Sequence, residues 1–285
     1  MTLPIDFDLN DFVRRTLAED LGAGGDVTSA ATIPADARFS AEMNCRQPIV
    51  VAGLKIAATF FEALDAGVRI DPLTDDGDAA EDGTVLMRLE GNARAMLAAE
   101  RSALNTLQHL SGIATLTRRY VDAIAGTGAA LLDTRKTIPG LRVLEKYAAR
   151  MGGAQNHRMR LDDGALIKDN HVAVCGGVAE AVRRARRANT GLEVQVEVDR
   201  IDQIEPALAA GADRLLLDNM PPSVLRDAVA LVGGRAPLEA SGGVTLETIR
   251  AIAETGVDYV SVGRITQSAP AVDIGLDYLL TSNSI

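Results

Sequence analysis

The chain has 285 residues, 47% of them hydrophobic, and a formal net charge of −10 at pH 7. A chain of this length can bury a core and form one large or two modest domains, and its dispersed negative charge argues against general binding to nucleic acid or to anionic membranes. The two cysteines, Cys45 and Cys175, exclude a disulfide framework and lack the Cys-x-x-Cys spacing of a thiolate zinc site.

The start of the sequence does not indicate export or membrane insertion. Residues 1–6 have neither the basic segment nor the apolar core of a secretory leader, and no apolar run reaches the length of a membrane span. We therefore expect a cytoplasmic protein that binds no membrane.

The first part of the chain, residues 1–111, predicts a domain of mixed helices and strands. The pattern indicates, in chain order, a helix at 11–19, strands at 39–44, near Val50 and at 84–89, and a helix at 93–109. These elements do not alternate, which favours a separate α+β domain ending at Ser111-Gly112. The apolar C-terminal stretch, 272–285, is expected to pack back on this domain.

Residues 112–271 repeat a different pattern, in which a short apolar run is followed by a polar or glycine-bearing turn and then by a helical stretch. The runs lie at 130–132, 165–167, 194–198, 214–217, 237–240 and 259–262, and the helices at 178–188, 201–210, 222–231 and 246–254. Parallel strands with right-handed crossovers follow from such units. Either a (β/α) barrel or an open α/β sheet fits, and the late glycine-rich turns favour an incomplete barrel of about six strands.

Basic side chains gather at the predicted strand ends, where the loops of a barrel converge. They are Arg135, Lys136, His157, Arg158 and Lys168. A solvated surface cluster would have the same composition. Because arginine forks suit paired carboxylates and lysine suits a point anion, we expect a substrate that carries a dicarboxylate and a phosphate. Lys168 could instead form a Schiff base, as in barrel aldolases.

Acidic and glycine residues occupy other strand ends. Glu197 and Asp218 follow neighbouring runs and could share Mg²⁺, act as general bases or pair with the arginines. The glycine turns Ser241-Gly242-Gly243 and Gly263 each precede a predicted helical segment. Such turns can hold a phosphate monoester through backbone N–H groups, although a simple tight turn also explains one of them.

Arg101 interrupts a stripe formed at helical spacing by Leu97, Leu104 and Gln108. Its charged end could extend to solvent or form an ion pair. Alternatively, Arg101 could complete the anion-binding site of a second subunit. His109 and His171 lack a polar cluster around them, and we expect both to be structural.

These residues together resemble the quinolinate phosphoribosyltransferase family, also called nicotinate-nucleotide pyrophosphorylase (carboxylating). The matching segments cover nearly the whole chain and are residues 19–22 and 25–28 (EDLG, GDVT), 100–105 and 110–115 (ERSALN, LSGIAT), 133–142 (DTRKTIPGLR), 156–158 (NHR), 166–171 (LIKDNH), 217–220 (LDNM), 239–244 (EASGGV) and Gly263. The DTRKTIPGLR and IKDNH segments are the most specific of these. Gln195 departs from the acidic residue frequent in the family, while Glu197 retains the expected acid.

The resemblance implies an N-terminal α/β sandwich domain and an open, incomplete α/β barrel in a homodimer or an assembly of dimers. It implies a pentosyltransferase that joins quinolinate to 5-phosphoribosyl-1-pyrophosphate with Mg²⁺, giving nicotinate mononucleotide, CO₂ and pyrophosphate for NAD biosynthesis. Alternatives are a paralogue encoded at a molybdenum locus with another acceptor, and a non-catalytic barrel that binds a phosphorylated metabolite.

The resemblance also implies a role for each candidate residue. The quinolinate carboxylates would contact Arg135, His157, Arg158 and Lys168, joined by Arg101 of the neighbouring subunit. Lys136, Glu197 and Asp218 would serve catalysis at the phosphoribosyl pyrophosphate, with Glu197 and Asp218 at the metal. Ser241, Gly242, Gly243 and Gly263 would bind the 5-phosphate.

Overall fold

The computed structural model describes residues 7–279, so the N-terminal residues 1–6 and the end of the expected tail, 280–285, lie outside the described part. The chain divides into two compact units. The first comprises Met1–Leu116, Val143–Gly152 and Ala269–Ile285, and the second Thr117–Arg142 and Gly153–Ser268. Residues 143–152, which the sequence placed in the second domain, are thus grouped with the first unit.

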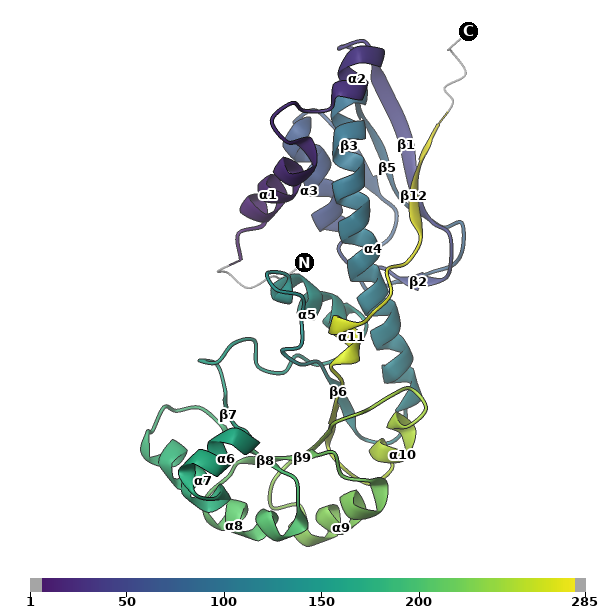
Figure 1. Ribbon diagram of the computed structural model, residues 1–285. Helices are drawn as coiled ribbons and strands as arrows, with labels where there is room; N and C mark the ends of the chain where they lie inside the picture. Colours follow the sequence, from purple (N-terminus) through teal and green to yellow (C-terminus); the bar gives the residue numbers. More distant parts are fainter. Residues whose placement is uncertain (1–6, 280–285) are drawn as a thin grey trace. The chain divides into compact units, whose positions relative to one another are not determined.

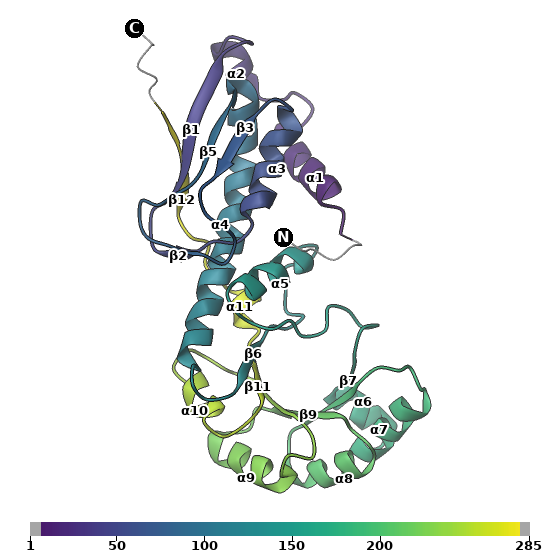
Figure 2. The ribbon, with the colours of Figure 1, turned by 180° about the vertical axis from the view of Figure 1, so that it is seen from behind.

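The first unit is built on an antiparallel sheet. Its elements are α1 (Leu9–Leu21), α2 (Val27–Thr32), β1 (Arg38–Cys45), β2 (Ile49–Val50), α3 (Leu54–Leu64), β3 (Arg69–Pro72), β4 (Ala79–Ala80), β5 (Val85–Asn92), the first part of α4 (Ala93–Ala123), most of α5 (Arg142–Met151) and β12 (Ile274–Tyr278). The sheet order is β12-β1-β5-β3, and β2 pairs separately with β4. Helix α4 lies in front of this sheet in Figure 1 and behind it in Figure 2.

Alternation along β1 explains the two faces of this sheet. Ala41, Met43 and Cys45 are fully buried, whereas Glu42 points the other way and accepts a hydrogen bond from Arg88 Nε at 2.8 Å. Strand β12 pairs with β1, with Ile274 opposite Cys45, so the described part of the C-terminal stretch lies in this sheet.

Helix α4 corrects the predicted helix end at Ser111-Gly112, because it continues to Ala123. Gly112 is a close-packing position within the first unit: a Cβ there would overlap the Pro270 carbonyl oxygen. The buried side of α4 carries Met96, Ala99, Ala103, Leu107 and Leu110. Arg101 is exposed, so it does not interrupt the buried stripe as the sequence suggested.

The second unit is a six-stranded parallel sheet with helices along one side. Its elements are the end of α4, β6 (Ala130–Leu132), β7 (Ala165–Ile167), α6 (Asp169–Cys175), α7 (Val178–Arg187), β8 (Val194–Val198), the 3₁₀ turn η1 (Ile201–Gln203), α8 (Ile204–Ala209), β9 (Arg214–Asp218), α9 (Pro222–Val232), β10 (Leu238–Ser241), α10 (Ile249–Ala253), β11 (Tyr259–Ser261) and α11 (Arg264–Gln267). Helices α7, α8, α9 and α10 lie along the outer side of the curved sheet (Figures 1 and 2).

The strand order confirms an open barrel. It runs β6-β11-β10-β9-β8-β7, so from β7 to β11 each strand lies beside the next one in sequence, and β6, the first strand of the unit, lies beside β11, the last. A doubly wound sheet would reverse its order in the middle. Here β6 and β7, consecutive in the chain, stand at opposite edges and leave the barrel open between them. The predicted fold class is therefore confirmed.

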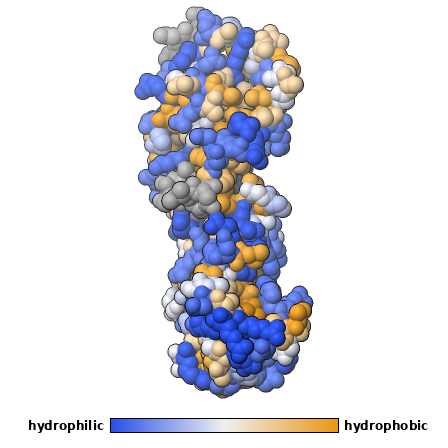
Figure 3. Space-filling view, turned by 90° about the vertical axis from the view of Figure 1, so that its left-hand side faces the viewer, coloured by the Kyte–Doolittle hydropathy of each residue, from blue (hydrophilic) through white to orange (hydrophobic). Residues whose placement is uncertain are grey.

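The surface is mixed in both units. On the face drawn in Figure 3, hydrophilic side chains surround smaller hydrophobic groups. The large exposed hydrophobic side chains of residues 7–279 are scattered along the chain, from Val27 to Tyr278. None of the helices in this range has the length and apolar character needed to cross a membrane.

Candidate functional site

A pocket of about 770 Å³ opens at the carboxyl ends of the parallel strands of the second unit. Strand register brings these ends level, because Ser241 lies opposite Asp218 and Val198 opposite Leu217. The lining includes Thr134, Arg135, Lys136, His157, Arg158, Lys168, Asp169, Glu197, Asp218, Asn219, Glu239, Ser241, Gly242, Gly243, Gly263, Arg264 and Gln267. Every predicted site residue except Arg101, which is on α4 in the first unit, lines this pocket.

Two guanidinium groups give part of the pocket a strong positive potential. Burial lowers the pKa of Arg158, and the neighbouring positive charge of Arg135 lowers it further. Arg135 Nε is buried and has no hydrogen-bond partner among residues 7–279. Arg158 uses one guanidinium nitrogen to donate to the Gly164 carbonyl oxygen at 2.9 Å. Like charges held this close favour an anion with more than one negative charge.

A buried aspartate fixes the segment that carries the second guanidinium. Asp133, at the end of β6, is 0% exposed. One of its carboxylate oxygens accepts from the His157 backbone N–H at 2.8 Å, and the other accepts from Asn156 Nδ2 at 2.6 Å. The DTRK and NHR segments are thereby locked together at the pocket.

Lysine and carboxylate side chains from adjacent strands meet at the same mouth. Lys168 Nζ lies 3.1 Å from Glu197 Oε2, so its ammonium group is used in an ion pair. His171, expected to be structural, accepts from the Lys168 backbone N–H through Nδ1 at 2.9 Å at the start of α6. Asp218 accepts from Asn219 Nδ2 at 2.6 Å.

The chemistry of Glu197 and Asp218 fits a hard cation. They stand on neighbouring strands and line one pocket, and Mg²⁺ typically takes one or two carboxylates with the rest of its ligands from substrate and water. Between residues 7 and 279 no three or more His, Cys, Asp or Glu side chains form a metal-binding group.

The glycine turns leave room that side chains would fill. Gly242 has a φ of +97°, and a Cβ there would overlap Asn219 Oδ1 and lie 2.9 Å from the Asn219 backbone nitrogen. Asn219 itself has a φ of +54°, which is rare for a residue other than glycine. At Gly263, a Cβ would lie 2.7 Å from Lys136 Cδ. These contacts bring the turn after β10 against the turn after β9, and the turn after β11 against the segment after β6.

One helix expected after a glycine turn begins later than predicted. Helix α11 starts at Arg264, immediately after Gly263, but α10 starts only at Ile249. A turn intervenes, because the Thr245 backbone N–H donates to Thr248 Oγ1 at 2.9 Å. The Ser241-Gly242-Gly243 turn therefore does not lead directly into a helix.

Asn219 and Glu239 are among the lining residues that the sequence-based set did not include. Asn219 belongs to an Asp-Asn pair after a strand, and its positive φ is visible only in three dimensions. Glu239 is a lone acid inside an apolar run, and a period of two places it on the same face as Ser241. That periodicity was the available signal for Glu239.

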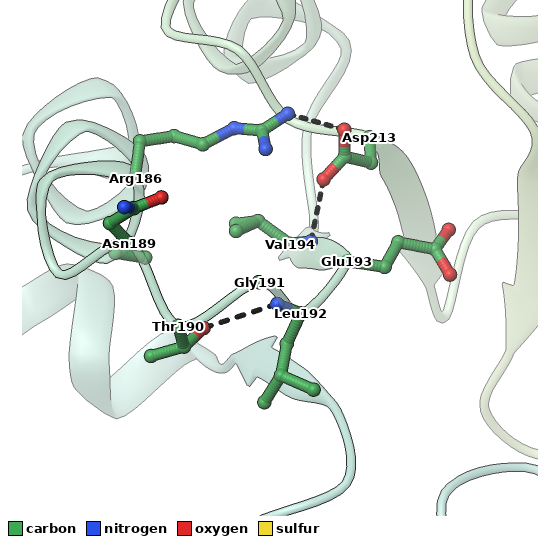
Figure 4. A pocket seen from close by; sticks show the side chains of 9 residues that line it. Arg186, Asn189, Thr190, Gly191, Leu192, Glu193, Val194 and Asp213 are labelled. Carbon is green, nitrogen blue, oxygen red and sulfur yellow. Dashed lines mark hydrogen bonds and ion pairs between the residues drawn. The ribbon is translucent and has the colours of Figure 1, made fainter.

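A second pocket, of about 440 Å³, lies near the amino end of β8 (Figure 4). Each of its charged groups has an ion-pair partner, and for Glu193 this is Arg214, outside the pocket lining. Arg186 forms an ion pair with Asp213, whose other carboxylate oxygen accepts from the Val194 backbone N–H at 2.7 Å. Arg186 Nε also donates to the Gly211 carbonyl oxygen at 2.6 Å. These contacts tie α7 to the strands and indicate a structural role.

Comparison with known proteins places both units in one family. Family profiles described as quinolinate phosphoribosyl transferase, N-terminal and C-terminal domains, match residues 26–111 and 113–277. The nicotinate-nucleotide pyrophosphorylase (carboxylating) of Mycobacterium leprae is 46% identical over 272 residues, which is 94% of this chain and 96% of the relative. A probable nicotinate-nucleotide pyrophosphorylase (carboxylating) of Bacillus subtilis is 41% identical over 278 residues, or 97% and 96% of the two chains. The solved nicotinate-nucleotide pyrophosphorylase of Ehrlichia chaffeensis superposes with a TM-score of 0.92 at 39% identity, covering 96% of this chain and 100% of that one.

Proposed function

Because the chain belongs to the quinolinate phosphoribosyltransferase family, we propose that it transfers the phosphoribosyl group of 5-phosphoribosyl-1-pyrophosphate to quinolinate. The products are nicotinate mononucleotide, CO₂ and pyrophosphate, which places the reaction in NAD biosynthesis. The observation that carries the proposal is a single pocket that contains a double guanidinium cluster, two carboxylates and a glycine cradle.

The guanidinium cluster suits the acceptor. Quinolinate carries two carboxylates on adjacent ring atoms, and the mutual repulsion of Arg135 and Arg158 is relieved when a dianion lies between them. The buried, unpartnered Nε of Arg135 gains an acceptor in the same step. Lys168 adds a third positive charge at the end of β7.

The opposite side of the pocket suits the donor. Gly242, Gly243 and Gly263 let backbone N–H groups approach a 5-phosphate, and Lys136, whose aliphatic stem packs against Gly263, lines the same pocket. Glu197 and Asp218 would hold Mg²⁺, which when bound neutralises charge on the pyrophosphate.

The reaction divides into two steps that need different groups. When the bond from the ribose C1 to pyrophosphate breaks, C1 becomes oxocarbenium-like, and the carboxylates Glu197 and Asp218 stabilise that positive charge. The ring nitrogen of quinolinate then bonds to C1 and becomes cationic. Loss of the adjacent carboxylate as CO₂ leaves a carbanion that the cationic nitrogen stabilises, and a proton from solvent completes nicotinate mononucleotide. Arginine and lysine side chains act mainly by orienting the dicarboxylate.

The ion pair between Lys168 and Glu197 argues against Schiff-base chemistry. The amine donates to a carboxylate 3.1 Å away and is not held as a free nucleophile. Borohydride should therefore trap no covalent adduct at Lys168.

The direct assay uses the purified chain with quinolinate, 5-phosphoribosyl-1-pyrophosphate and Mg²⁺. We expect CO₂ release and pyridine-nucleotide formation in equal amounts. Arg135→Ala should raise the KM for quinolinate with little change in the KM for the donor, while Arg183→Ala, a surface change on α7, serves as the matched control. Product from another acid but not from quinolinate would overturn the proposed acceptor.

We further propose that the enzyme works as a homodimer in which Arg101 completes the neighbouring subunit's acceptor site. The support is that Arg101 is an exposed cation on α4 that does not line the pocket of the second unit. Equal amounts of inactive Arg101→Ala and Lys168→Ala chains, refolded together, should recover about a quarter of the wild-type activity, since random pairing completes that share of sites. No recovery, with dimers present, would contradict site sharing.

A further inference from the structure

A buried carboxylate lies at the floor of the acceptor side of the pocket. Glu239, in β10, is 0% exposed. Its Oε2 accepts from Gln195 Nε2 at 2.7 Å and lies 3.4 Å from His157 Nε2. These contacts hold the pKa of Glu239 below its usual range against the opposing effect of burial. A buried charge is costly without such partners, so the buried carboxylate of Glu239 depends on the side chains of Gln195 and His157.

The hydrogen bonds determine which nitrogen of His157 carries the proton. The Arg158 backbone N–H donates to His157 Nδ1 at 2.7 Å, and because a peptide N–H can only donate, Nδ1 is unprotonated. Nε2 therefore carries the hydrogen and directs it toward Glu239. Both ring nitrogens are thus used inside the protein, Nδ1 as an acceptor and Nε2 facing Glu239.

We propose that Glu239 and Gln195 are positioning residues, which act through His157 to set the acceptor-binding conformation of Arg158. The inference rests on the proposed function only in that the acceptor is taken to be quinolinate. In this arrangement His157, which lines the pocket, also joins β10 to the Arg158 backbone.

The amide of Gln195 determines the charge of this floor. As a donor to Glu239, it leaves the buried pair with a single negative charge. Without this amide, Glu239 Oε2 would lose the shorter of its two polar contacts, which is costly for a buried carboxylate. The other groups that face Glu239 are His157 and Ser261, from the neighbouring segment and from β11.

Two substitutions and one spectroscopic measurement test the proposal. Glu239→Gln removes the charge that orients the ring, and Gln195→Met removes the amide that donates to Glu239. Glu254→Gln is the matched control, because this exposed carboxylate pairs only with Arg250 one turn away on α10. The tautomer of His157 is read by ¹⁵N NMR of labelled histidine, which is simplified by a total of three histidines in the chain.

We expect the wild-type spectrum to show the Nε2–H tautomer at His157. Glu239→Gln should weaken that preference and raise the KM for quinolinate on the order of 10-fold, the size typical of losing an orienting partner, with the donor KM changed by less than about 2-fold. Gln195→Met, which loses the amide donor to Glu239, should also raise the KM for quinolinate, while Glu254→Gln should show no such change.

The outcomes separate this proposal from the proposed function. An Nδ1–H tautomer in the wild-type spectrum would overturn the proposal, as would an equal rise of both KM values in Glu239→Gln. An Nε2–H tautomer that depends on Glu239, in a protein that does not use quinolinate, would retain this role of Glu239 and refute only the acceptor.

Discussion

Gly242→Ala tests the packing of the glycine cradle directly. The added methyl group meets two obstacles at once, since the backbone φ is +97° and the Cβ would overlap Asn219 Oδ1. Asn219 has little freedom to retreat, because its backbone N–H donates to the Ser241 carbonyl oxygen at 2.8 Å and its side chain donates to Asp218. The substitution should therefore displace the Asp218-Asn219 turn.

The cost has two parts. A left-handed conformation costs an L-residue about 1–2 kcal/mol, and forcing an extra methyl group into a packed site costs about 1–3 kcal/mol. Gly242→Ala should thus lower the free energy of unfolding by about 2–5 kcal/mol. Gly234→Ala is the matched control, because its φ is +77° and a Cβ there meets nothing within 4 Å, so only the first part applies, about 1–2 kcal/mol.

Urea unfolding and steady-state kinetics measure both consequences. We expect Gly242→Ala to raise the KM for 5-phosphoribosyl-1-pyrophosphate on the order of 10-fold or more, and Gly234→Ala to leave it unchanged. Equal stability losses in the two variants, with an unchanged donor KM in Gly242→Ala, would show that the close contact between Gly242 and Asn219 does not exist in solution.

Two further predictions concern groups away from the pocket. Asp213→Ala removes the ion pair and the backbone acceptor shown in Figure 4, so the free energy of unfolding should fall by about 1–3 kcal/mol while both KM values are retained. The control Asp202→Ala breaks an exposed ion pair with Arg200 and should lower the free energy of unfolding by less than about 1 kcal/mol. Equal losses in the two variants would contradict a structural role for Asp213. Burial raises the pKa of the Cys45 thiol, whereas Cys175 is partly exposed. At pH 8 a disulfide reagent should therefore modify Cys175 quickly and Cys45 only in denaturant. Rapid modification of both cysteines in the native protein would refute the burial of Cys45.

Local sequence was sufficient for the strands of the second unit. The apolar runs at 130–132, 165–167 and 194–198 correspond to β6, β7 and β8, and the helical run at 178–188 corresponds to α7. The ends of such strands can be read from the local sequence, because both faces of a parallel strand are buried and must be apolar, while the turns that follow are polar. Family-specific segments such as DTRKTIPGLR added the fold class and the reaction, which the strand order and the comparisons confirmed. The roles of the individual pocket residues remain predictions.

Other features depended on contacts between distant segments. Ser111-Gly112 looked like a helix end, but the glycine serves a close approach by Pro270, which no local pattern encodes. The contacts of His157 with Glu239 and with the Arg158 backbone also join segments far apart in the chain or depend on local geometry, and residue type alone did not indicate them.

The sequence alone therefore predicted that the basic residues at the strand ends lie together, because parallel strands bring their carboxyl ends to one edge of the sheet whatever the details of packing. Only the tertiary structure decided which of their polar atoms bond to other protein groups and which have no protein partner in the pocket. Arg135 retains a buried unpartnered nitrogen, whereas Lys168 pairs with Glu197. The physical reason is that a hydrogen bond depends on distances of a few tenths of an ångström between segments far apart in the chain, and residue type and spacing do not specify those distances.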